Sequence, residues 1–427
     1  MTRAMTCLLS VLLICLAIVS VVNAAPVKVV HVMANHGEPF FQFLKERAVA
    51  FHETFPEVEV EVLAQQGDYT TKVQLMIAGG SQVDVLDSTS SFMAFAGADC
   101  LADLMPCVKA ERVNLDREML GFARRVLMKG DRLLGIPSQL FGVVAAYNRT
   151  YFDEMGVAPL RSLGGAWNWD WLRANAARLT KASGDGVPVT WGVSFSTALY
   201  NLAQPVHQAG GSMFDAYLEP RRALMTTEPV REGLGFYVEL CQRDWGVPRG
   251  AGAGFYTKRE AAITLAAAGA NYSYFASTSD DFEAVVQPKG PVRRGGTTVF
   301  GPYHVPAASE QQAWAFRWIS FLAFNEESQV QMMRATGRIP GHYSTLRKLE
   351  QFLGSQDSRT RSFLIQVRDA STDADGFPRT LTRAEGAINR FFAPAFNQVL
   401  NGGLALDSFL ENMQTQMQVE LDKLYVK

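Results

Sequence analysis

The chain has 427 residues and a formal net charge of −2 at pH 7, from 40 Lys and Arg against 42 Asp and Glu. This near-neutral balance excludes nucleic acid and anionic membranes as partners, because both require a strongly basic face. The length is sufficient for two or more hydrophobic cores.

The first 24 residues predict a signal peptide. Arg3 is the only charge before a largely apolar run over residues 8–22, and Val22 and Ala24 occupy the −3 and −1 positions of a cut after Ala24. The run is shorter than the roughly 20 residues that a membrane-spanning helix needs. We therefore expect an exported, periplasmic protein that is cleaved near Ala24.

The next segment alternates strands and helices. Strands are predicted at Val27–Met33, Val58–Leu63 and Val83–Leu86, where β-branched residues alternate or cluster. Helices are predicted between them at Phe40–Thr54 and Tyr69–Ala78. This order indicates parallel strands with helical crossovers.

The remaining two thirds of the chain continue the α/β pattern and end in a mostly helical segment. The predicted elements are a hairpin at 130–137, extended chain at 141–147, helices at 148–155, 169–180, 200–208, 230–243, 255–266 and 310–324, and strands at 191–195 and 284–287. The sequence contains no internal repeat or long polar linker. Two lobes would therefore be joined by strands that cross between them.

Three cysteines follow the signal peptide: Cys100, Cys107 and Cys241. In an oxidising compartment, Cys100 and Cys107 are the pair expected to form a disulfide, and two unbonded thiols are the alternative. Their spacing does not match a zinc site, and we expect no metal and no cofactor.

Several short motifs occur in a recognisable order. They are Phe55-Pro-Glu-Val-Glu-Val60, Gly79-Gly-Ser-Gln-Val-Asp84, Leu134-Gly-Ile-Pro137, Gln208-Ala-Gly-Gly211 and Ala335-Thr-Gly-Arg-Ile-Pro340. Their order resembles the family 1 extracellular solute-binding proteins, the sugar-binding group of ABC transporters that includes maltose-binding protein. Val83 stands where that family usually has proline.

The resemblance implies an α/β, two-lobed periplasmic binding protein fold of type II-like organisation. Each lobe would be a mostly parallel sheet flanked by helices, with a cleft between the lobes. The N-terminal lobe would comprise residues 25–143 and about 292–340, and the C-terminal lobe residues 144–291 and about 341–427.

The same resemblance implies the substrate-binding component of an ABC importer. Its small-molecule ligand would be a mono- or oligosaccharide, a polyol or a sugar phosphate, bound by cleft closure without catalysis. Its protein partner would be an ABC permease in the inner membrane, and the chain itself would be a monomer.

Ligands of open α/β sheets bind outside the carboxyl ends of the strands, and sugars need both polar partners and aromatic faces. This position favours His36 and Glu38 after the first strand, Gln66 after the second and Asp87 after the third. Each has an alternative. Glu38 also suits the start of a helix, Gln66 suits a solvated loop, and residues 87–91 suit a helix cap.

The other candidates lie near the predicted hinge or in the second lobe: Gln139, Tyr200, Asn271, Tyr272, Tyr303 and Arg338. The resemblance places Tyr200 and Tyr272 where the family has cleft aromatics. The alternatives are a backbone hydrogen bond in the hinge for Gln139, hinge packing for Tyr303 and a salt bridge within one lobe for Arg338.

A secreted carbohydrate-active hydrolase is the alternative function. The sequence has neither a Gly-x-Ser-x-Gly elbow nor a His-Glu-x-x-His metal motif. A glycosidase carboxylate pair has no fixed sequence spacing, so the hydrolase stays the second hypothesis. The first hypothesis is a binding protein that is not an enzyme.

Overall fold

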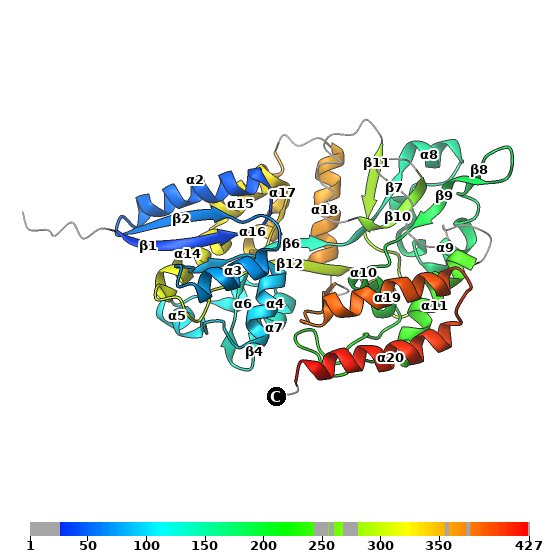
Figure 1. Ribbon diagram of the computed structural model, residues 1–427. Coiled ribbons are helices and arrows are strands. Elements are labelled where there is room, and N and C mark those ends of the chain that lie inside the picture. Colours follow the sequence, from blue (N-terminus) through cyan, green and yellow to red (C-terminus); the bar gives the residue numbers. More distant parts are fainter. Residues whose placement is uncertain are drawn as a thin grey trace, which may run out of the picture.

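The computed structural model describes residues 26–242, 255, 260–267, 281–354, 358–372 and 376–425. Figure 1 shows two α/β lobes side by side, joined in the middle by the strands β6 (Ile136–Gly142) and β12 (Thr297–Tyr303). The predicted signal peptide lies outside the described residues.

The first lobe is built on a parallel sheet with strand order β2-β1-β3. Strand β1 (Val27–Met33) pairs along its whole length with β2 (Val58–Ala64) and at its end with β3 (Val85–Leu86). From Val29 onward β1 is buried, as expected for a parallel strand covered on both faces. The three predicted strands are confirmed, although β3 is shorter than expected.

Helices with well-defined ends connect these strands. They are α2 (Glu38–Thr54), α3 (Tyr69–Ala78) and α4 (Thr89–Gly97). Asp68 caps α3 by accepting from the Thr71 amide at 3.2 Å, and Ser88 caps α4 by accepting from the Ser90 amide at 3.2 Å. Helix α3 begins and ends where the sequence predicted.

Smaller elements and a second group of helices complete the first lobe. They are α5 (Met105–Ala110), α6 (Leu115–Glu118), α7 (Gly121–Leu127), β4 (Met128–Lys129), β5 (Arg132–Leu133), α14 (Gln312–Phe324), α15 (Glu326–Thr336), β13 (Ile339–Pro340), α16 (Tyr343–Arg347) and α17 (Leu349–Phe352). Helix α14 buries Trp318 against Phe51 of α2.

The lobes are joined by a small sheet with strand order β13-β6-β12-β14. Strands β6 and β12 are antiparallel, with an irregularity between Gly301 and Pro302, and β14 (Phe377–Pro378) pairs with the start of β12. A bridge between Leu86 and His304 joins the end of β12 to the first lobe. The predicted crossing strands are therefore confirmed.

The second lobe contains a five-stranded sheet with strand order β11-β7-β10-β9-β8. The strands are β7 (Val144–Asn148), β8 (Lys181–Ala182), β9 (Pro188–Ser194), β10 (Ala261–Ala267) and β11 (Phe282–Val285). Strands β9 and β10 are parallel, and the other pairings are antiparallel. This sheet is mixed, whereas a mostly parallel sheet was expected in each lobe.

Strand β10 corrects one prediction. The sequence predicted a helix over 255–266 because alanine is the strongest helix former, but residues 261–267 form a strand. Strand β10 lies between β7 and β9, so neighbours on both edges satisfy its backbone groups, and Ile263 and Leu265 are buried. Tertiary pairing overrides the local preference here.

The helices of the second lobe are α8 (Arg149–Glu154), α9 (Trp169–Asn175), α10 (Leu199–Gln208), α11 (Glu228–Gln242), α19 (Glu385–Leu400) and α20 (Leu406–Lys423), with a 3-10 helix at Leu160–Ala166. The predicted helix at 169–180 ends early, at Asn175. None of the helices in the described part of the chain is long and apolar enough to cross a membrane.

The described residues form two hydrophobic cores, one around Phe43 and Trp318 and the other around Trp169 and Phe392. The first core extends to one face of the second-lobe sheet, where it includes Phe282 of β11. Helices α16, α17 and α18 (Ser358–Thr372) pack against the first core, whereas the boundary expected near residue 341 assigns them to the C-terminal lobe. Helix α18 stands between the lobes in Figure 1 and contacts β6 and β11. Of the C-terminal helices, α19 and α20 join the second core.

The expected disulfide between Cys100 and Cys107 is not formed, and both cysteines are free thiols. Cys100 is exposed, and its Sγ donates to the Ala98 carbonyl at 3.3 Å. Cys107 lies in α5 and packs against the first core. The two side chains therefore point to different environments.

Helix α11 crosses α10 closely at Gly233. A β-carbon there would lie 2.5 Å from the Val206 amide nitrogen, whereas at Gly235, in the same helix, the nearest atom is Leu406 Cδ2 at 3.5 Å. We predict that Gly233→Ala destabilises the protein by about 1–3 kcal/mol, because the two backbones must separate.

The matched control is Gly235→Ala, which should stabilise the protein by up to about 1 kcal/mol through helix propensity. Urea denaturation followed by circular dichroism measures both variants. Equal effects of the two substitutions would contradict the close approach of the helices.

Candidate functional site

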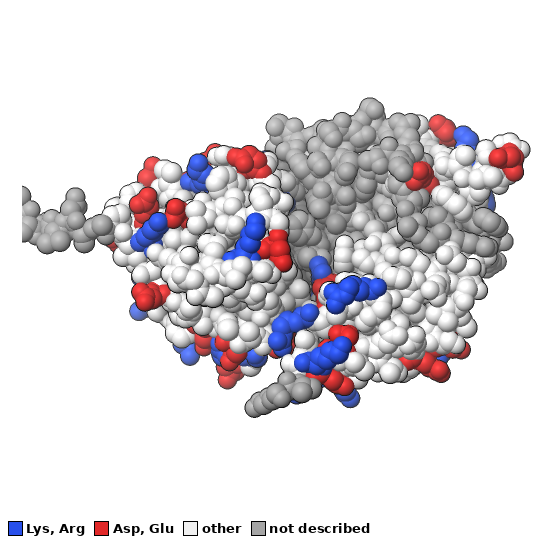
Figure 2. Space-filling view, viewed as in Figure 1, with Lys and Arg blue, Asp and Glu red and all other residues white. Residues whose placement is uncertain are grey.

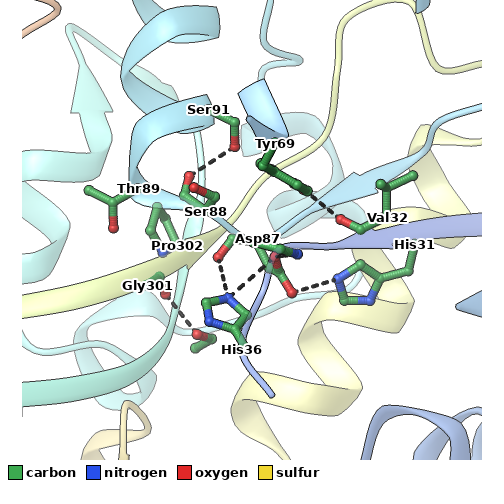
Figure 3. A network of polar contacts seen from close by, with 12 residues as sticks. His31, Val32, His36, Tyr69, Asp87, Ser88, Thr89, Ser91, Gly301 and Pro302 are labelled. Atoms are coloured by element: carbon green, nitrogen blue, oxygen red, sulfur yellow. Dashed lines mark hydrogen bonds and ion pairs between the residues drawn. The ribbon is translucent and has the colours of Figure 1, made fainter. Parts of the chain in front are cut away.

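The first half of the candidate site lies where β1 and β3 end against β12. Figure 3 shows His31 and His36 on either side of Asp87, with Gly301 and Pro302 of the crossing strand nearby. His31 belongs to β1, whereas Asp87 directly follows β3. The meeting of parallel strand ends at one edge of the sheet brings these residues together.

Asp87 is 1% exposed. Its Oδ1 accepts from the Ala34 amide at 2.8 Å, and its Oδ2 lies 3.4 Å from His31 Nε2. Burial alone would raise the pKa of Asp87, but the charge of His36 and the hydrogen bonds from both histidines outweigh it and hold that pKa well below its usual range. Asp87 is therefore an ionised carboxylate that ties the loop after β1 to the end of β3.

Arg338 connects the loop after β1 to the hinge. Its Nη2 donates to the His36 carbonyl at 3.0 Å, and its Nη1 donates to Gln139 Oε1 at 2.8 Å. Its guanidinium lies 4.5 Å from the Phe40 ring centre. Four predicted residues, His36, Asp87, Gln139 and Arg338, thus form one connected network.

Two other candidates near the same strands stand apart from this network. Glu38 is exposed at the first position of α2, where its carboxylate accepts from Gln42 Nε2 at 2.5 Å. Gln66 is exposed in the loop before α3. Glu38 thus has the surroundings of a residue at a helix start, and Gln66 has those of a residue in a solvated loop. These are the alternatives that the sequence offered for each.

Tyr303 is fully buried at the end of β12, where its ring packs edge-on against His31 at 5.8 Å. Burial raises the pKa of the Tyr303 hydroxyl. Its position is that of a packed hinge aromatic, with no surface available to a ligand in this conformation. The candidates Asn271 and Tyr272 lie outside the described residues.

Tyr200 lines a narrow pocket in the second lobe, between α10, the 211–217 loop and the 377–385 segment. The Arg379 guanidinium carbon lies 4.8 Å from the centre of the Tyr200 ring, and Arg379 Nη2 donates to the Glu385 carboxylate. His207 and Phe377 close one side, with ring centres 3.9 Å apart. The pocket therefore offers aromatic faces beside one ion pair.

Sequence reasoning missed the other polar and aromatic side chains of this pocket, among them His207, Phe377, Arg379 and Glu385. The helical spacing of residues 200, 203 and 207 was an available signal, because it places them on one face of α10. Arg379 follows the two-residue strand β14 and Glu385 begins α19, whereas the sequence predicted a mostly helical segment here and no strand.

The hinge sheet connects the two half-sites. Thr297 Oγ1 donates to the Tyr200 carbonyl at 2.9 Å, and the Arg379 amide donates to the Thr298 carbonyl at 3.0 Å. On the first lobe's side, Thr89 Oγ1 donates to the Phe300 carbonyl at 3.2 Å. Movement of β12 therefore changes the position of one half-site relative to the other.

The lobes also touch away from the hinge. Lys129 Nζ of the first lobe lies 3.9 Å from the Glu219 carboxylate, which in turn lies 3.7 Å from Arg383 Nε. Figure 2 shows basic and acidic side chains gathered where the lobes meet at the lower edge of this face. Among the described residues, no cluster of three or more His, Cys, Asp and Glu side chains could hold a metal ion.

Three solved structures have a similar fold. The cyclic alpha-maltosyl-1,6-maltose binding protein of Arthrobacter globiformis matches 93% of this chain and 100% of its own at a TM-score of 0.78, with 17% identity. The cycloalternan complex of a Listeria monocytogenes ABC substrate-binding protein matches 94% and 100% at 0.74, with 19% identity. UgpB of Mycobacterium tuberculosis with glycerophosphocholine matches 95% and 100% at 0.71, with 17% identity.

No curated protein matches this chain in sequence. A family model, described as bacterial extracellular solute-binding protein, matches residues 34–329, which is well over half of the chain. The two-lobed architecture and the crossing strands agree with this match, and the resemblance drawn from the sequence motifs is confirmed. The chain belongs to the bacterial extracellular solute-binding protein family.

Proposed function

We propose that this protein is the substrate-binding component of an ABC importer and that it closes its two lobes around a sugar or a sugar-like solute. The observation that carries the proposal is the placement of two half-sites on opposite lobes of one hinge. Their polar and aromatic side chains lie at the ends of strands and helices that the crossing strands hold together.

The chemistry of the half-sites suits a carbohydrate. Tyr200 and Phe377 provide apolar faces for C–H groups, and Arg379 provides donors for hydroxyl oxygens. Two of the similar solved structures are complexes, one with cycloalternan and one with glycerophosphocholine, and the third is named as a binding protein for cyclic alpha-maltosyl-1,6-maltose. The pocket's cation, Arg379, is paired with Glu385, so its charge is already balanced. A neutral sugar that packs on the aromatic faces therefore suits the pocket better than a phosphate ester.

The second-lobe pocket is too small for a sugar in this conformation. Its free volume is about 20 Å³, enough for about one water molecule. A ligand must therefore enter while the lobes or the lining side chains are displaced. We propose an equilibrium between open and closed arrangements, shifted by the ligand toward closure.

Binding without catalysis is the favoured mode of action. A glycosidase needs two carboxyl groups that face the scissile bond from opposite sides. Asp87 is buried with its oxygens directed at protein groups, and Glu385 is paired with Arg379. The described residues of the two half-sites therefore do not present the pair of facing carboxyl groups that a glycosidase needs.

The cellular setting is part of the proposal. The family is extracellular, and the N-terminal pattern supports export with cleavage near Ala24 and residence in the periplasm. We further propose that the protein acts as a monomer and delivers its ligand to a permease in the inner membrane.

We predict that one class of carbohydrate raises the melting temperature of the protein without signal peptide, because a ligand that binds only the folded state stabilises it by mass action. The panel is maltose, maltotetraose, cycloalternan, glycerol and glycerophosphocholine. Small-angle scattering should show a smaller radius of gyration with the same ligand. Recovery of cleaved sugar would instead indicate the hydrolase, and a flat response to every carbohydrate would contradict sugar binding.

We predict that Arg379→Gln weakens binding of the stabilising ligand by about tenfold or more, because a charge-assisted hydrogen bond contributes roughly 1.5–3 kcal/mol. The matched control is Arg173→Gln. Arg173 also lies over an aromatic ring, Phe236, and also pairs with a glutamate, Glu239, but it does not line the pocket. Calorimetric titration that found equal losses for both variants would argue against the pocket.

A further inference from the structure

The two lobes make a second contact at Gly97, the last residue of α4. A β-carbon built on Gly97 would lie 2.6 Å from Arg383 Cζ and closer still to Arg383 Nε and Cδ. Arg383 precedes Ala384, which belongs to the second core, whereas Phe95 and Ala96 of α4 belong to the first. The Arg383 side chain therefore reaches across from the second lobe and fills the space that the glycine leaves open.

Glu219 of the second lobe lies between one cation of each lobe. Its Oε1 is 3.7 Å from Arg383 Nε and its Oε2 is 3.9 Å from Lys129 Nζ, without hydrogen bonds between these atoms. Lys129 also donates to the Ala96 carbonyl at 3.3 Å and lies 3.6 Å from Asp99. The Glu219 and Arg383 side chains are only 17% and 28% exposed, so solvent screens their attraction less than that of a fully exposed pair.

The backbone at Glu219 is held in an unusual conformation by the end of α20. Glu219 has a φ of 47°, in the left-handed region that residues with a side chain rarely adopt. Its amide donates to the Leu381 carbonyl at 2.9 Å, and its carbonyl accepts from the Tyr425 hydroxyl at 2.8 Å. The Arg221 guanidinium carbon lies 4.6 Å from the centre of the Tyr425 ring. Tyr425 therefore fixes the turn from which Glu219 reaches the first lobe.

The same end of α20 also contacts Arg383, because the Leu424 carbonyl accepts from Arg383 Nη2 at 3.4 Å. Tyr425 and Lys129 line one groove between the lobes, and Figure 1 shows α20 ending at this seam on the side of β4. All of these contacts are made by protein atoms alone, so they can form before a ligand binds.

We propose that Gly97, Lys129, Glu219 and Arg383 form a latch that holds the empty protein in a partly closed arrangement, and that Tyr425 is a positioning residue for this latch. The proposal goes beyond the proposed function, because it concerns the empty protein and applies whichever solute is bound. The hinge allows the lobes to bend apart, whereas the latch is a contact that must break before they separate. The four latch residues do not line the Tyr200 pocket.

The first test is Tyr425→Phe in the protein without signal peptide and without ligand. Phenylalanine keeps a ring beside Arg221 and removes only the hydroxyl that holds the Glu219 carbonyl. Small-angle scattering should show a larger radius of gyration than in the wild type, because a loosened turn no longer places Glu219 between the two cations. An unchanged radius would overturn the role of Tyr425.

Tyr151→Phe is the matched control for loss of a tyrosine hydroxyl. The Tyr151 hydroxyl also donates to a backbone carbonyl, that of Leu179 at 2.8 Å, but both residues lie within the second lobe. Its substitution should lower the melting temperature and leave the radius of gyration unchanged. An equal increase in radius for both variants would show a general loosening of the second lobe and overturn the assignment to Tyr425.

The second test is Gly97→Ala, which places a methyl group where the Arg383 side chain lies. A long side chain can swing away, so stability in urea should stay near that of the wild type while the empty protein opens. The matched control is Gly121→Ala in α7 of the same lobe, where no atom of the described residues lies within 4 Å of the added β-carbon. An unchanged radius in Gly97→Ala, or an equal change in Gly121→Ala, would overturn the latch.

Two further variants separate the parts of the latch. Glu219→Gln keeps the shape of the side chain and removes its charge, so it should also increase the radius of the empty protein, and no increase would overturn the role of the ion pairs. The double variant Gly97→Ala with Tyr425→Phe should increase the radius by less than the sum of the single increases, because both act through one contact. Additive increases would overturn the positioning role of Tyr425.

Discussion

The antiparallel pairing of β6 with β12 is the constraint on which the rest of the structure depends. Strand β6 carries the chain out of the first lobe, and β12 carries it back from the second. Both half-sites are hydrogen-bonded to β12 through Thr297, Thr298 and Phe300. A flexible tether would allow the lobes to rotate freely. Two bonded strands limit them to bending at a few backbone positions, and such limited bending lets the same two surfaces meet repeatedly.

The two half-sites are built by different means. In the first lobe, the ends of parallel strands bring His31 and His36 within 3.4 Å of the ionised Asp87 carboxylate, which also accepts a hydrogen bond from the Ala34 amide. In the second lobe, Tyr200 and Arg379 come from a helix and from an irregular segment, and their contact is a cation over a ring. The first arrangement is rigid and polar, whereas the second is more adaptable and largely aromatic.

Local patterns predicted much of the fold. The alternating β-branched residues located β1 and β2, and the glycine pair at 79–80 located the end of α3, because strand and helix signals of this kind are contained within a few residues. Strand β10 was missed because its neighbours in the sheet, not its alanines, determine its conformation. The candidate site, too, was predicted where local patterns determine it and missed where distant segments do. Position after a strand indicated His36 and Asp87, but the burial of Asp87 and the pairing of Arg379 with Tyr200 depend on segments far apart in the chain.

The contact between the lobes through Lys129, Glu219 and Arg383 affects the energetics of closure. The apparent affinity for ligand is reduced when only a small fraction of the empty protein is in the closed arrangement. A protein that is partly closed without ligand therefore binds more tightly than one that is fully open. These three side chains are partly exposed, and ion pairs that are accessible to solvent become weaker as the salt concentration rises. The ionic strength of the surroundings would thus adjust how readily the empty protein closes, and so how much solute it retains from a dilute medium.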